Sequence, residues 1–309
     1  MRYYADDSYL HARIYAMRSR LIPPDGYPPF LRDHEVSNAG PRGMVEAKEA
    51  AFREQIAPVV HLAEATRRYA PLLIAFLRRY EANNVKILLA KAFGRQTIEQ
   101  WYDIGPYATL DRALLDGDPT PDDLRAALTG TYLDGIFEGR ATYERIEDRV
   151  DIRTARHLFD TSDSFPSEGR EVFRDFILRR LAALVVIRQW RLRVTYGWSD
   201  ERIWAYRDEL GALFGETDWP QVRELVGVLV RRLKEMGGQT PGPAEVESFV
   251  ERSYYRWVAS MFHRDFHSVH CVMAYLWLLD YQIRNLLCII EGIRFGLSPE
   301  AILATIISD

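Results

Sequence analysis

Lysine, cysteine and long apolar runs are all scarce in this chain of 309 residues. Only four of its 40 basic residues are lysines, so nearly all positive charge is carried by arginine, which suits bidentate contacts at interfaces. The two cysteines, Cys271 and Cys288, lie in apolar helical patterns, so we expect reduced thiols rather than a disulfide framework. The longest uninterrupted apolar run, 271–279, is much shorter than the roughly 20 residues of a membrane-spanning helix. We therefore predict a chain without a transmembrane segment.

Signatures of nucleotide and nucleic-acid binding are missing too. No lysine follows a glycine, so the chain lacks the Gly-Lys pair of a phosphate-binding loop. Acidic residues (44) outnumber basic residues (40), which gives a net charge of -4 and no overall attraction to a polyanion. These absences exclude a nucleotide-hydrolysing subunit and predict that nucleic acid is not a partner.

What the chain does contain is helical patterning. Hydrophobic residues make up 48% of the sequence, and apolar positions recur at helical spacing along most of it. No convincing alternation of apolar and polar residues bounded by hairpin turns is found. Residues 22–43 hold five prolines and three glycines and are expected to form a loop, whereas 244–293 are expected to be a nearly continuous helical region. The predicted fold class is all-α.

An internal repeat is the strongest signal in the sequence. Three helical patterns end in an aromatic residue followed by a glycine, at Gly94, Gly197 and Gly296, which lie at even intervals along the chain. A glycine in this place allows the left-handed conformation that closes a helix. After the second and third glycines, Ser199 and Ser298 are each followed by an acidic residue and are predicted to cap the next helix.

The repeat extends upstream of two of these glycines. Asn83 and Asn285 both precede their glycine by the same number of residues, whereas the second copy has no asparagine there. We predict three similar helical domains, at residues 1–115, 116–215 and 216–309, of which the second is degenerate.

Four segments, in order along the chain, resemble one protein family. They are ARIYAMRSRLI (12–22), YEANNVKILLAKAFG (80–94), YLWLLDYQIRNLLCIIEGI (275–293) and GLSPEAI (296–302). They are similar to the component that is named C in archaeal and bacterial V/A-type ATP synthases and named d in the eukaryotic vacuolar enzyme. The middle copy, 186–203, departs from the family pattern where an asparagine is expected.

The resemblance implies a non-catalytic rotor component without a cofactor. The family forms a funnel of three similar helical domains around a pseudo-threefold axis. Its wide end sits on the membrane-embedded proteolipid ring, and central stalk subunits of the D and F type insert into its socket. The expected location is therefore peripheral, on the cytoplasmic face of the membrane, where the protein couples ATP hydrolysis or synthesis to ion translocation.

Polar residues around the repeats are the candidates for partner contact. For Asn285 an internal hydrogen bond is favoured over partner contact, and for Glu291 both roles stay open. Arginine pairs elsewhere, such as Arg78–Arg79 and Arg179–Arg180, are interpreted as solvated helix faces or as contacts to an acidic partner. The basic candidates are Arg18, Arg20, Lys86, Lys91, Arg191, Arg284 and Arg294.

Two other functions are compatible with parts of the sequence. His263, His267 and His270 would share one face of a continuous helix, and imidazoles at this spacing can bind zinc, so an all-α metal-dependent enzyme is an alternative. The pattern lacks a His-Glu-x-x-His sequence and a second ligand cluster, and we therefore predict no metal site. A helical repeat scaffold without a rotor role is the third possibility.

Overall fold

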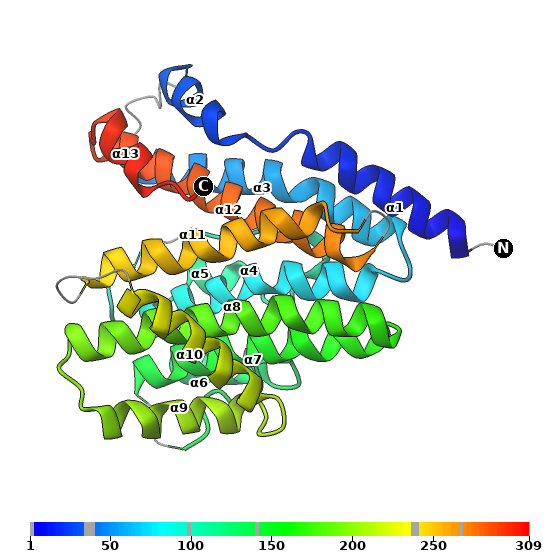
Figure 1. Ribbon diagram of the computed structural model, residues 1–309. Helices are drawn as coiled ribbons and strands as arrows, with labels where there is room; N and C mark the ends of the chain where they lie inside the picture. The colour runs from blue at the N-terminus through cyan, green and yellow to red at the C-terminus, as the bar shows by residue number, and fades with distance from the viewer. Residues whose placement is uncertain are drawn as a thin grey trace.

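The computed structural model describes residues 3–33, 41–97, 100–139, 142–235, 241–265 and 268–308, and Figure 1 shows their arrangement. All regular secondary structure in these residues is helical, which confirms the predicted all-α class. The long helices are α1 (Tyr3–Arg18), α3 (Pro41–Ala65), α4 (Ala70–Ala92), α7 (Tyr143–Thr161), α8 (Ser167–Val194), α9 (Asp200–Phe214), α10 (Trp219–Glu235), α11 (Pro243–Phe262) and α12 (Val269–Arg294). The short helices are α2 (Tyr27–Asp33), α5 (Ala113–Asp116), α6 (Pro121–Leu128) and α13 (Pro299–Thr305), with 3-10 turns η1 (Pro24–Gly26), η2 (Gly105–Tyr107) and η3 (Ser162–Ser164).

Six of the helices pack as three antiparallel pairs that close into a ring. The pairs are α3 with α4, α7 with α8, and α11 with α12, and a short connection joins the two helices of each pair. Between pairs, α4 packs on α7, α8 packs on α11, and α12 packs back on α3. Figure 1 shows the connections within the pairs at the right end and α13, which follows α12, at the left end. The helices α4, α8 and α12 therefore end on the same side. The pseudo-threefold relation of the pairs stays a prediction.

The core of the molecule is centred on α12, which is buried along most of its length. The side chain of Trp277 is 1% exposed and lies edge-on to Phe76 of α4, at 5.8 Å between ring centroids, and to Tyr254 of α11, at 5.5 Å. Edge-to-face packing of this kind stabilises aromatic pairs beyond the apolar area that they bury. The C-terminal pair is thus joined to the N-terminal pair through one aromatic cluster.

The three repeat glycines all follow the end of a ring helix. Gly94, Gly197 and Gly296 have φ angles of 65°, 63° and 66°, in the left-handed region that a residue with a Cβ atom rarely adopts. After α4, the Arg95 N–H donates to the carbonyl of Ala90 at 2.8 Å, and the end of α12 repeats the pattern with a Leu297 to Gly292 bond of 2.9 Å. After α8 the matching bond is one residue wider, from Trp198 to Leu192 at 3.1 Å, so the second copy closes its helix differently.

The expectation of a loop over 22–43 was wrong for part of the segment. Residues Tyr27–Asp33 form α2, and α3 begins at Pro41. Pro28 and Pro29 fall in the first turn of α2, where a helix has no internal acceptor for the N–H groups that proline lacks. Proline therefore signals a helix start here as well as a break.

The expectation of nearly continuous helix over 244–293 also needs correction. The chain leaves helical geometry after Phe262, and α12 begins at Val269 with Ser268 as its cap, whose Oγ accepts from the N–H of His270 at 3.1 Å. The interruption lets α12 turn back along α11, with which it forms the third antiparallel pair.

Candidate functional site

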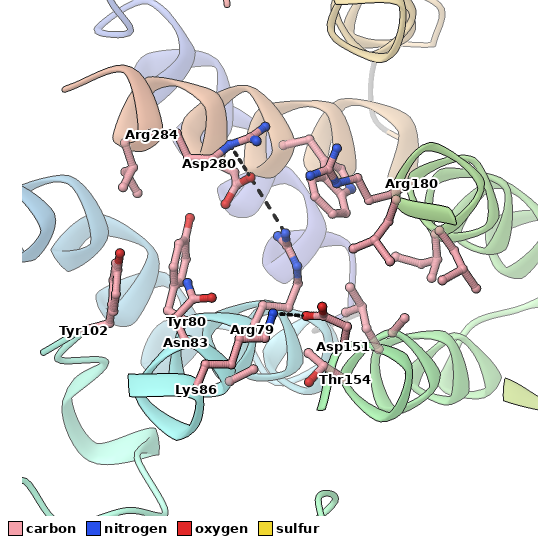
Figure 2. Close-up of a pocket in the computed structure, with 18 of the residues that line it drawn as sticks. Arg79, Tyr80, Asn83, Lys86, Tyr102, Asp151, Thr154, Arg180, Asp280 and Arg284 are labelled. Carbon is pink, nitrogen blue, oxygen red and sulfur yellow. Dashed lines mark hydrogen bonds and ion pairs between the residues drawn. The ribbon is translucent and has the colours of Figure 1, made fainter. Parts of the chain in front are cut away.

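A cavity of about 490 Å³ lies between α4, α7, α8 and α12 (Figure 2). It is the place where the second helices of the three pairs face one another across the ring. Its wall mixes apolar side chains with six charged ones, so the centre of the molecule is polar in part. The charged lining residues are Arg79, Lys86, Asp151, Arg180, Asp280 and Arg284.

Two arginines share one buried carboxylate behind the cavity wall. The guanidinium of Arg180 donates to both oxygens of Glu251, at 2.9 and 2.8 Å, and Arg284 donates to the same oxygens at 3.4 and 3.2 Å. Tyr281 adds a hydroxyl donor at 2.7 Å. Burial alone would raise the pKa of Glu251, but the charges of Arg180 and Arg284 outweigh it and hold that pKa well below its usual range. Glu251 is therefore ionised, and its charge fixes both arginines.

A second group of charges crosses the cavity itself. Arg79 extends from α4 toward Asp280 of α12, with 3.7 Å between its Nη2 and the nearer carboxylate oxygen (Figure 2). Lys86, also on α4, forms an ion pair with Asp151 of α7. Arg284 reaches Asp280 from one turn away on α12, at 3.5 Å. The cavity is thus electrostatically organised, and most of its charges join different helices.

Each boundary between the three pairs is bridged by an ion pair. Lys86 to Asp151 joins α4 to α7, and Arg180 to Glu251 joins α8 to α11. The boundary between α12 and α3 is crossed by Glu291 and Lys48, at 2.5 Å. The ring is therefore tied at all three seams by charges as well as by apolar packing.

One end of the ring carries most of the exposed large hydrophobic side chains. Seven such side chains occur in the described residues, and five of them lie within three residues of a repeat glycine. Phe93, Tyr196 and Phe295 directly precede the three glycines and are 39%, 69% and 70% exposed. The other two are Val194 and Leu297. Exposed aromatic groups gathered at equivalent positions indicate an interaction surface. We call these five side chains the aromatic end.

The sequence-predicted basic residues fall into separate places. Lys86 and Arg284 lie in the cavity. Lys91, Arg191 and Arg294 lie in the last turns of α4, α8 and α12, close to the aromatic end. Lys91 donates to the carbonyl of Leu115 at 2.7 Å, and Arg191 pairs with Glu247 of α11.

Arg18 and Arg20 lie away from both of these regions. Arg18 ends α1 and stacks over the ring of Phe262, at 5.6 Å from its centroid. Arg20 borders a groove of about 670 Å³ between α1, α3 and α12. The structure does not bring the seven basic candidates together into one site.

The residues of the repeat have structural partners. The side chain of Asn285 donates to the carbonyl of Ile307 at 2.9 Å and accepts from its N–H at 3.0 Å. In α4 the residue with the matching bonds is Asn84, which donates to the carbonyl of Tyr102 at 3.0 Å and accepts from its N–H at 2.8 Å. Asn83 instead lines the cavity.

The two predicted serine caps have hydrogen bonds to the helices that follow them. The Oγ of Ser199 accepts from the N–H of Arg202 at 3.4 Å, and that of Ser298 accepts from the N–H of Ala301 at 3.2 Å. Each satisfies one of the donors that the first turn of a helix leaves without an internal acceptor.

The histidine cluster does not form as the sequence suggested. His263 is exposed just after the end of α11, and His270 lies in the first turn of α12, so they do not share a face of one continuous helix. His267 lies outside the described residues. Within those residues, no group of three or more His, Cys, Asp and Glu side chains is placed to hold a metal ion. The metal-dependent enzyme has no support in this structure.

Several interacting charged residues in and behind the cavity wall were not proposed as site residues. Arg79 and Arg180 were interpreted as parts of solvated helix faces or of contacts to an acidic partner, but their side chains are only 18% and 19% exposed. Glu251 was not proposed as a site residue either, although it lies on the buried, apolar side of α11. The available signal was the spacing of Asp280 and Arg284, which places opposite charges one turn apart on a very apolar helix. Such charges need internal partners.

Comparison with known proteins identifies a family. A family model described as ATP synthase (C/AC39) subunit matches residues 25–305, which is nearly the whole chain. No curated protein matches the sequence. In the parts of the chain that the structure describes, none of the helices combines the length and the apolar composition needed to cross a bilayer.

Proposed function

Because the chain belongs to the ATP synthase (C/AC39) subunit family, a non-catalytic component of rotary ATPases, we propose that it couples the central stalk to the membrane ring. Central stalk subunits of the D and F type enter the middle of the helical ring. The proteolipid ring contacts the aromatic end. The protein turns with both and transmits torque between ATP hydrolysis or synthesis and ion translocation, from a peripheral position on the cytoplasmic face.

The observation that carries this proposal is the closed ring of helix pairs around a charged central cavity. Helices from all three pairs line the cavity, so a segment held there contacts the whole ring rather than one edge. Charged groups at a binding cavity contribute more to a specific orientation and to fast association than to affinity. These properties suit a joint that must hold a partner in register.

A torque-transmitting part also has to resist shear between its pairs. The three seam ion pairs and the aromatic cluster around Trp277 connect neighbouring pairs directly. Close-packed interiors have low compressibility and pass strain from one side to the other. The ring is accordingly expected to rotate as one body.

The aromatic end supports the assignment of the membrane-ring contact. Phe93, Tyr196 and Phe295 follow the ends of three helices, α4, α8 and α12, that run in the same direction (Figure 1), so a partner made of repeated identical units meets similar groups at several points. Aromatic side chains are enriched at protein interfaces because they bury a large area with few rotatable bonds.

A tagged pull-down from mild-detergent membranes tests the proposal. The chain should recover stalk and proteolipid subunits in fixed ratio. The triple variant Phe93→Ser, Tyr196→Ser and Phe295→Ser should keep the stalk and lose the proteolipid ring, because these side chains are exposed and their removal spares the core. Tyr9→Ser, which removes an aromatic side chain that is 48% exposed on α1, serves as the matched control. Recovery of the chain alone would contradict the proposed function.

A further inference from the structure

The charges on one side of the central cavity do not balance. Arg79, Arg180 and Arg284 converge there from α4, α8 and α12. Within ion-pair distance of these three arginines, the carboxylates of the described residues are Glu251 and Asp280. Three positive charges therefore face two negative ones.

The remaining charges in the cavity wall and directly beside it compensate one another. Lys86 pairs with Asp151, and Arg188 pairs with both Asp151 and Asp148. These two cations and two carboxylates leave no net charge on their side. The centre of the molecule consequently holds one unmatched positive charge, although the chain as a whole is negative.

Arg79 is the arginine whose hydrogen-bonding capacity is least used. Its Nη1 is buried and has no hydrogen-bond partner among the described residues, and its Nη2 stays 3.7 Å from Asp280. The guanidinium lies over the ring of Trp277, at 3.9 Å from the centroid. The indole Nε1 of Trp277 is also buried, and no acceptor among the described residues reaches it, on a side chain that is 1% exposed. Unused donors thus belong to side chains of the cavity wall, on the side where positive charge is in excess.

A bound oxyanion would balance the unmatched positive charge and accept hydrogen bonds from the unused donors. A buried guanidinium without hydrogen bonds is destabilising, because it has lost its hydration and gained no acceptor. Carboxylate and phosphate oxygens match the fork of N–H groups that arginine presents. The cavity of about 490 Å³ has space for such a group on a protein segment or as a free ion with water.

We propose that the central cavity binds one oxyanion, held by Arg79 with Arg180 and Arg284 beside it. Its physiological form is the carboxylate of an acidic side chain on the segment that the ring receives, and this identification rests on the proposed function. A free phosphate ion has the same chemistry and is the other source. The site itself is defined by the unmatched charge and the unused donors, whichever source supplies the anion.

Inorganic phosphate is the probe for the site. The full-length chain, labelled with 5-fluorotryptophan, is titrated with phosphate at constant ionic strength, and the Trp277 resonance is assigned with Trp277→Phe. We expect a saturable shift of this resonance. Arg79→Met should weaken phosphate binding about tenfold or more, and Arg79→Lys should restore part of it. Arg125→Met removes an exposed arginine on α6 and should change nothing.

The same titration also shows whether a variant is folded, because the dispersion of the other tryptophan resonances is read in the same spectrum. An absent Trp277 response in the parent chain would overturn the proposal. Equal phosphate affinity in the parent and in a folded Arg79→Met variant would overturn it as well.

Competition with the stalk subcomplex separates the two sources. If a stalk carboxylate occupies the site, phosphate weakens stalk binding, and Arg79→Met weakens it too. If free phosphate is the ligand, the Trp277 response persists while stalk binding is insensitive to phosphate and to Arg79→Met. A chain that binds phosphate at Trp277 but never binds the stalk would contradict the proposed function and leave the oxyanion site standing.

Discussion

The second helices of the three pairs, α4, α8 and α12, differ in how they hold the segment that follows them. A buried asparagine does so in α4 and α12, but not in α8. In α4 and α12, Asn84 and Asn285 each bond to both backbone groups of a downstream residue. Around the corresponding turn of α8, the polar contact is instead the ion pair of Arg188 with Asp151, which reaches the neighbouring helix α7.

The helix content of the downstream segments differs in parallel. After α8 come α9 and α10, two full helices whose buried side chains pack against α7 and α8 and hold them in place. Among the described residues, α12 is followed by α13 alone, and α4 is followed by the 3-10 turn η2 and the short helices α5 and α6. Where no long helix begins directly after the ring helix, a specific polar anchor fixes the start of the following segment. An amide that satisfies one donor and one acceptor at once is such an anchor.

Removing the amide anchors should have the largest effect on stability. Asn285→Ala and Asn84→Ala each leave the N–H and the carbonyl of a partly buried backbone unit without partners, and we expect each to lower the free energy of unfolding by about 3 kcal/mol. Guanidinium-induced unfolding, followed by circular dichroism, measures the change. The control is Asn83→Ala, a half-buried neighbour that makes no such contact, for which a loss below about 1 kcal/mol is expected. Equal losses in Asn83→Ala and Asn84→Ala would contradict the comparison.

Lowering the pH should weaken the ionic contacts of α8 but not the amide anchors, because only the carboxylates of the ionic contacts titrate in this range. The pKa of Glu251 is held below its unfolded value, so the folded state binds fewer protons than the unfolded state, and this stabilisation is present at neutral pH and lost as the pH falls. The loss from Glu251 alone is expected to reach about 2 kcal/mol near pH 3. The stability difference between the parent chain and Glu251→Gln should therefore shrink by this amount between about pH 6 and pH 3.

The Asn285→Ala variant is the control for the acid experiment. Its stability difference from the parent chain should stay constant over the same pH range, because an amide does not titrate there. A difference that shrinks as strongly as that of Glu251→Gln would show that acid acts on the fold as a whole.

Replacing the three repeat glycines should have the smallest effect on stability, and the effect should be equal at the three positions. A Cβ atom at position 94, 197 or 296 would meet nothing within 4 Å, so alanine there changes only the backbone conformational energy. We expect a loss of about 1 kcal/mol for each Gly→Ala variant in urea-induced unfolding. The control Gly227→Ala, within α10, should instead raise stability by up to about 1 kcal/mol. Unequal losses at the three positions would contradict a common conformational role for these glycines.

The sequence predicted those features that depend on local signals. All-α composition follows from apolar spacing, and the left-handed glycines and serine caps follow from residues adjacent in the chain. The partner of Asn285 could not be predicted in the same way, because Ile307 reaches it only after the chain has turned back along α12. The choice of Asn84 over Asn83 depends on which side of α4 faces Tyr102.

The cavity depended on packing that no local pattern encodes. Arg79 and Arg180 belong to arginine pairs that would be solvated on an isolated helix, and they are buried only because α4, α8 and α12 converge. The expectation that three histidines would share one helix face was wrong for the opposite reason, because it assumed a continuous helix where the chain reverses between α11 and α12. The arginines and the histidines therefore differ in whether packing between distant segments buries them together, which residue type alone does not reveal.

ATP-driven ion pumping by the reconstituted complex, with and without this chain, tests the coupling role most directly. Proteoliposomes that carry head, stalk and ring but lack the chain should hydrolyse ATP without moving ions, and adding the purified chain should restore pumping. Full pumping in its absence would contradict the account, because torque would then pass from the stalk to the ring without this protein.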